Sequence, residues 1–174
     1  MAAHNGNLPI ANLLLENGAN VNDKDKSNNT ALKFASENGR TEVAKLLIDS
    51  GADINAKNQY NQTSLIRASE EGHTETVLML VENGADLNAT DDWGATALIK
   101  TSFTNQIDIV SILLENGADM SIKDRNGNTA LVWASNEGYI DIVTLIKQKK
   151  IRDANLVVKK GKTQDGRPLM PHAQ

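Results

Sequence analysis

The strongest constraint on the fold is a pair of sequence patterns that each recur every 33 residues. The dipeptide Gly-Ala begins at Gly18, Gly51, Gly84 and Gly117. A second pattern has the same step and reads TALKFAS from Thr30, TSLIRAS from Thr63, TALIKTS from Thr96 and TALVWAS from Thr129. Because a fixed period of this length is a signature of repeat architectures, the chain is predicted to be a stack of similar units.

Each unit carries signals for two helices separated by a short turn. The Thr that opens the second pattern precedes a helical sequence, where its hydroxyl can accept a hydrogen bond from a free backbone N–H. A glycine such as Gly39 or Gly72 marks the turn, and the second helix carries apolar pairs such as Leu46 and Leu47. The glycine of Gly-Ala suits the left-handed conformation beyond the last turn. The unit is therefore predicted to be helix, turn, helix and extended loop.

This pattern resembles the ankyrin repeat, whose signature is T-P-L-H-x-A. The resemblance covers about residues 2–147 and implies an all-α solenoid of stacked helix-turn-helix units joined by β-hairpin-like loops. The predicted divisions are an N-terminal half repeat and hairpin (1–24), three full repeats (25–57, 58–90 and 91–123), a C-terminal repeat (124–147) and a basic tail or C-terminal cover (148–174).

Several positions depart from the ankyrin signature. The Pro is replaced by Ala31, Ser64, Ala97 and Ala130, and the His by Lys33, Ile66, Ile99 and Val132. The Thr–His hydrogen bonding typical of the family is therefore not expected, and apolar packing is predicted in its place. Asn28 and Asn61 stand where two other units have Gly. Since Asn tolerates positive φ better than most residues, the turn geometry is expected to be kept.

The charge distribution limits the partners that the repeats can bind. Residues 147–174 contain eight Lys or Arg against two Asp, a formal charge of +6, which leaves −10 for the first 146 residues. An acidic body does not favour a polyanion, so we do not expect the repeats to bind nucleic acid. The chain has no Cys and no apolar run of about 18 residues that could span a membrane. Its first residues do not resemble a signal peptide, so a cytoplasmic location is predicted. The protein is also expected to be monomeric.

Patterns for catalysis and metal binding are incomplete. The segment DKDKSNN from Asp23 begins like a calcium loop, but Phe34 stands at the twelfth position, where a bidentate Glu is needed. The GKT sequence from Gly161 resembles the end of a phosphate-binding loop, but Leu156 replaces the earlier glycine. The three His residues lie in unrelated contexts, and no G-x-S-x-G motif occurs. The sequence therefore predicts no catalytic residue, no metal site, no cofactor and no enzymatic activity.

The repeat period also identifies side chains that stack as neighbours along the solenoid. One such ladder holds Phe34, Arg67, Lys100 and Trp133, a loop ladder holds Tyr60 and Trp93, and a third holds Phe103. The resemblance implies that these ladders lie on the hairpin tips and the concave face of the first helices, where ankyrin proteins bind partners. Aromatic residues and Arg also carry much of the energy of protein interfaces. The predicted partner-binding residues are Phe34, Tyr60, Arg67, Trp93, Lys100, Phe103, Arg125 and Trp133.

The predicted function is that of a non-catalytic module that binds a partner protein or peptide. The bound segment is expected to be extended or helical, with an apolar anchor and an acidic neighbour. Replacing Trp93 and Trp133 by Ala is expected to abolish capture of the partner with little change in the thermal midpoint.

Two alternative functions stay open at the level of sequence. One is a targeting domain excised from a larger enzyme or effector, because the first unit begins midway through its first helix. The same N-terminal residues are also compatible with a minimal cap made of one helix, with Pro9 in its first turn. The other alternative is that the basic tail binds an acidic surface or nucleic acid.

Overall fold

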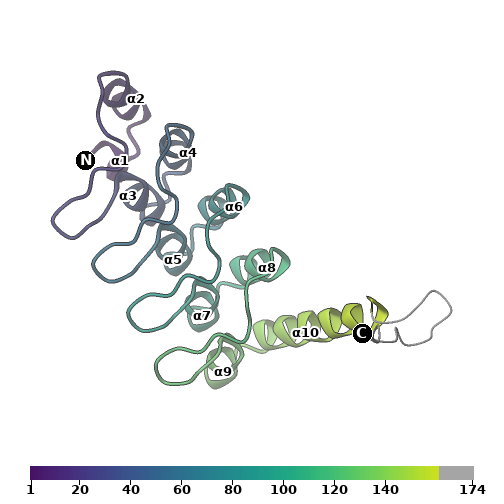
Figure 1. Cartoon of the computed structure of the whole chain (residues 1–174). Coiled ribbons are helices and arrows are strands. Elements are labelled where there is room, and N and C mark those ends of the chain that lie inside the picture. The colour runs from purple at the N-terminus through teal and green to yellow at the C-terminus, as the bar shows by residue number, and fades with distance from the viewer. Residues whose placement is uncertain (161–174) are drawn as a thin grey trace, which may run out of the picture.

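The structure is a computed structural model that describes residues 1–160. The helices in this part alternate between an inner layer (α1, α3, α5, α7, α9) and an outer layer (α2, α4, α6, α8, α10), and the loops project from the inner layer away from the outer one (Figure 1). Their bounds are α1 Ala2–Asn5, α2 Leu8–Glu16, α3 Ala31–Glu37, α4 Thr41–Asp49, α5 Ser64–Glu70, α6 Thr74–Glu82, α7 Ala97–Phe103, α8 Ile107–Glu115, α9 Ala130–Asn136 and α10 Ile140–Lys160. Each inner helix packs on the next inner helix, and each outer helix on the next outer helix.

The repeated sequence signals begin and end the helices as predicted. The hydroxyl oxygens of Thr30, Thr63, Thr96 and Thr129 accept hydrogen bonds from the backbone N–H three residues later, at 3.2, 3.3, 3.3 and 3.4 Å. Asn28 and Asn61 adopt φ of 62° and 57° in the turns where other units have Gly. Asn105 does the same between α7 and α8, at a φ of 60°. Asn thus substitutes for Gly at each of these left-handed positions.

The loops between units are stacked in register by backbone hydrogen bonds. The N–H of Asp92 donates to the carbonyl of Tyr60 at 3.1 Å, and the N–H of Arg125 donates to the carbonyl of Trp93 at 2.9 Å. A carboxylate or amide oxygen braces each loop from within, as when Asp91 Oδ1 accepts from the N–H groups of Trp93 and Ala95, both at 2.9 Å. The loop tips are therefore held at fixed positions relative to one another.

A second set of hydrogen bonds joins neighbouring units through the segments that follow the outer helices. The Asn of one unit accepts a hydrogen bond from the backbone N–H of an Asp in the next unit. The pairs are Asn22–Asp53, Asn55–Asp86 and Asn88–Asp119, at 2.7, 2.8 and 2.9 Å. These repeated polar residues therefore align neighbouring units.

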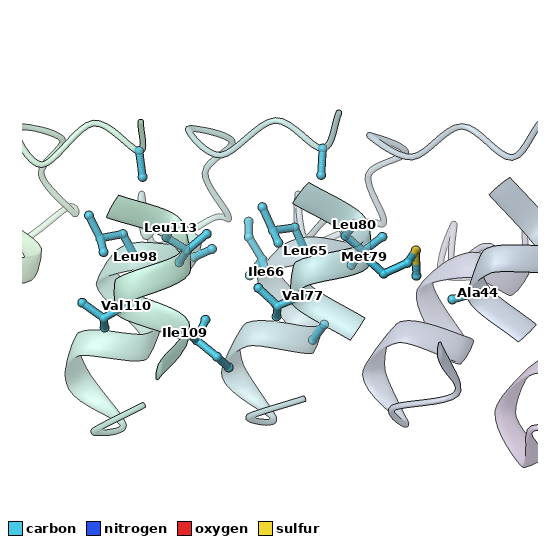
Figure 2. Close-up of a cluster of buried hydrophobic side chains, with 14 of the residues drawn as sticks. Ala44, Leu65, Ile66, Val77, Met79, Leu80, Leu98, Ile109, Val110 and Leu113 are labelled. Atoms are coloured by element: carbon cyan, nitrogen blue, oxygen red, sulfur yellow. The ribbon is translucent and has the colours of Figure 1, made fainter. Parts of the chain in front are cut away.

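The hydrophobic core lies between the two layers and runs the length of the stack. Figure 2 shows part of it, with Leu65 and Leu98 of the inner helices packed against Leu80 and Leu113 of the outer helices. At the position of the family's His, Ile66 and Ile99 are buried, as the sequence predicted. The prediction of apolar packing is wrong at Lys33, which is buried but forms an ion pair with Glu37 at 3.0 Å. Val132 is partly exposed, because no further unit covers it among the described residues.

The last outer helix differs from the others in length. Helices α4, α6 and α8 each have nine residues and end at Ser-Gly or Asn-Gly, whereas α10 has 21 residues and projects from the stack (Figure 1). It passes without a break through the boundary expected after Lys147. The later part of the predicted tail, 161–174, lies outside the described residues. None of the described helices is long and apolar enough to cross a membrane.

Candidate partner-binding site

Four of the predicted binding residues line a single groove. Trp93, Lys100, Phe103 and Trp133 surround a volume of about 270 Å³ between the loops and helices α7 and α9. We call this the aromatic groove. The remaining lining residues, which the sequence analysis did not identify, are Ala95, Ile99, Asp124 and Asn126.

One wall of the aromatic groove is fixed by contacts within the protein. The rings of Phe103 and Trp133 meet edge to face, with centroids 5.1 Å apart and an interplanar angle of 74°. The indole N–H of Trp133 donates to Asp124 Oδ2 at 2.7 Å, and the half-buried ring packs against the core. Because its orientation is set before any ligand arrives, this wall can bind an apolar side chain with little ordering cost.

Trp93 lines the aromatic groove and also a second depression. Hydrogen bonds hold its backbone N–H and carbonyl, while the residue as a whole is 68% exposed. Together with Tyr60, Asp92 and Arg125, it borders a volume of about 380 Å³ that we call the loop groove. Two further predicted residues, Tyr60 and Arg125, therefore lie beside the aromatic groove.

Arg67 is engaged within the protein. Its guanidinium pairs with Glu37, Glu70 and Glu71. Burial alone would lower the pKa of Arg67, but the hydrogen bonds and charges of Glu37 and Glu70 outweigh it, and the pKa is raised. The charge of Arg67 is therefore already compensated in the free protein.

Lys100 is compensated in the same way, although it lines the aromatic groove. Its Nζ lies 3.1 Å from Asp91 Oδ2 and 3.4 Å from Glu70 Oε1. An amine held by two carboxylates has less to gain from an acidic ligand than a free amine would.

Phe34 lies apart from the other predicted residues. It sits in the first full repeat, half-buried, with its ring centroid 6.4 Å from that of His4 and 5.5 Å from Lys33 Nζ. It lines a separate pocket formed with the N-terminal half repeat. The structure therefore does not bring Phe34 into the aromatic groove.

The chemistry available in the groove is that of binding. Its lining residues supply three aromatic rings, two aliphatic side chains, one amine and the oxygens of Asp124 and Asn126, with no hydroxyl, thiol or imidazole among them. Within residues 1–160, no cluster of His, Cys, Asp or Glu is arranged to hold a metal ion. The arrangement can enclose an apolar side chain and contact polar groups on either side of it.

Comparison with known proteins agrees with this architecture. The family model described as "Ankyrin repeats (3 copies)" matches residues 1–91 and again residues 65–159. None of the curated proteins compared with the chain matches it. Ankyrin repeats generally mediate protein–protein interaction, and the family is generally non-catalytic. Because these two overlapping matches together cover residues 1–159, this chain belongs to the ankyrin-repeat family.

Proposed function

We propose that this chain is a non-catalytic interaction module that binds a partner protein through the aromatic groove and the adjoining loop groove. The observation that carries the proposal is the exposure of Trp93 and Phe103, at 68% and 47%, beside the fixed ring of Trp133. Three of the six aromatic residues in the chain thus line one hollow of the surface. Exposed apolar surface that the core does not need is typical of a binding site.

The surroundings of the groove also suit an interface. Large aromatic side chains set in a rigid frame bury much area at a small entropic cost, and such residues dominate measured binding energies. The frame here consists of the loop hydrogen bonds and the packed helices α7 and α9. A partner would therefore meet a preformed surface rather than a loop that must first be ordered.

The proposal is tested by capture with matched variants. The groove variant is Trp93→Ala with Phe103→Ala, which leaves the half-buried Trp133 in place. The control variant is Leu78→Ala with Ile107→Ala, which truncates two partly exposed apolar residues of the outer helices α6 and α8. Proteins from the source cell that are retained by the wild type and by the control are expected to be lost with the groove variant. Equal retention by all three immobilised proteins would contradict the proposal.

A further inference from the structure

A network of ion pairs along the inner helices and the adjoining loops carries one more negative charge than positive charge. The network links the cations Lys33, Arg67 and Lys100 with the carboxylates Glu37, Glu70, Glu71 and Asp91. Three positive charges are thus set against four negative ones. This network extends along the inner helices up to the aromatic groove, where Lys100 is the last member.

The two kinds of charge in this network are not equally accessible. The side chains of Arg67 and Lys100 are 17% and 19% exposed, whereas those of Glu70 and Glu71 are 28% and 44% exposed. Arg67 and Lys100 are therefore less exposed than Glu70 and Glu71, although Asp91, the other partner of Lys100, is only 2% exposed. A ligand that approaches this network meets the carboxylates of Glu70 and Glu71 first.

Two more carboxylates flank the tryptophans. Asp124 lines the aromatic groove, and Asp92 lines the loop groove, where its Oδ1 accepts a hydrogen bond from the neutral amide of Asn61 at 2.7 Å. Arg125 supplies one opposing charge in the loop groove. With −10 on the first 146 residues, the local and the overall charge have the same sign.

We infer that the partner segment places an apolar side chain in the aromatic groove and a basic residue, Arg or Lys, directly beside it. This inference rests on the proposed function and specifies the class of ligand. The exposed face of Trp93 offers a cation–π contact to a guanidinium or ammonium, and the nearby carboxylates favour the same charge. The acidic neighbour expected from the sequence is disfavoured, because Arg67 and Lys100 already have carboxylate partners.

Selection from a peptide library tests the ligand class. A displayed library of random dodecapeptides is selected in parallel on the wild-type chain, on the Trp93→Ala/Phe103→Ala variant and on the Leu78→Ala/Ile107→Ala control. Peptides retained by the wild type and the control but not by the groove variant are expected to carry Arg or Lys next to an aromatic or aliphatic residue.

The other outcomes of this selection separate the two proposals. If the groove-dependent peptides carry acidic or uncharged residues beside the anchor, the charge inference is overturned and the proposed function stands. If no retained peptide depends on the groove, the proposed function falls, and the inference that rests on it falls too.

A titration then tests the position of the basic residue. The most enriched peptide is added to the wild type, to the groove-side variant Asp92→Asn and to the control Asp108→Asn, whose exposed carboxylate lies on the outer helix α8. Binding is followed by the emission of Trp93 and Trp133, the two tryptophans of the chain. The groove-side variant is expected to bind about three-fold or more weakly, and the control to bind as the wild type does. An unchanged affinity of the groove-side variant, or an equal loss in both variants, would contradict a basic residue seated beside the groove.

Discussion

At the scale of single residues, Trp93 and Trp133 line the same groove with different amounts of structural support. Trp93 is mostly exposed, and its side chain is free to contribute to binding. Trp133 packs against the core, meets Phe103 edge to face and donates its indole N–H to Asp124. Trp133 therefore contributes to folding as well as to the shape of the groove, so the expectation that both tryptophans can be replaced with little change in the thermal midpoint is revised for Trp133.

This difference predicts unequal effects on stability. Trp93→Ala is expected to change the free energy of unfolding by no more than about 0.5 kcal/mol, as is usual for surface substitutions. Trp133→Ala is expected to lower it by about 2–4 kcal/mol, because it opens a gap against the core and leaves Asp124 Oδ2 without its indole donor. Urea denaturation followed by circular dichroism measures both. An equal loss of unfolding free energy in the two variants would show that the half-buried contacts of Trp133 do not contribute to stability.

The residues of the groove could be predicted from the sequence only in part. The ladders identified Trp93, Lys100, Phe103 and Trp133, because the repeat period places equivalent positions side by side. They missed Asp124, whose signal was its place in the series of Asp or Asn that open each loop. Which cations are compensated depends on contacts between units, such as that of Arg67 with Glu37, and on how deeply each partner is buried.

At the scale of helices, Glu37 joins α3 to α5 through its pair with Arg67. Burial by itself would raise the pKa of Glu37, but hydrogen bonds from Arg67 and Lys33 outweigh it and hold the pKa below the ordinary value of 4.5. A carboxylate whose pKa is lower in the folded state stabilises the protein above its unfolded pKa. That contribution is lost as the pH falls through the folded pKa.

The variant Glu37→Gln is therefore expected to have a pH-dependent cost. Near pH 7 it should lower the free energy of unfolding by about 1 kcal/mol, since Arg67 keeps Glu70 and Glu71 as partners. The difference from the wild type should shrink at acid pH, as Glu37 becomes protonated. Urea denaturation at the two pH values measures this, with the exposed Glu75→Gln as the control. A difference that stays constant with pH would contradict the role of the ion pair.

The helices themselves were predictable where the sequence contains both a start and a stop signal. Thr caps, glycines and, after α7, Asn105 mark the boundaries of α3 to α8, and the structure follows them. The length of α10 was not predicted, because the sequence there lacks the stop signal that ends the other outer helices. After Ile146 no Asn-Gly follows, and Lys, Gln and Arg continue the helix at low cost.

At the scale of the whole molecule, burial between units is smallest at the N-terminal end. Ile10 and Leu14 of α2 are 48% and 50% exposed, although the positions 99 residues further on, Ile109 and Leu113 of α8, are fully buried. The same side-chain positions thus bury different amounts of apolar surface, depending on whether a unit has neighbours on both sides. In a solenoid, stability is approximately a sum of the units and of the interfaces between adjacent units.

The N-terminal unit is therefore expected to open before the rest of the stack. Opening α2 breaks one interface between units, whereas opening α6 or α8 breaks two, so amide hydrogen exchange should be faster in α2 than in either of the other helices. Leu14→Ala should correspondingly cost about 1 kcal/mol, while Leu113→Ala should cost about 3 kcal/mol, because only the second leaves a cavity in a closed core. Exchange measured by mass spectrometry and urea denaturation of the two variants are independent measures of the same gradient. Equal protection of α2, α6 and α8 would mean that the described units open together, and that the exposed side chains of α2 do not weaken its attachment.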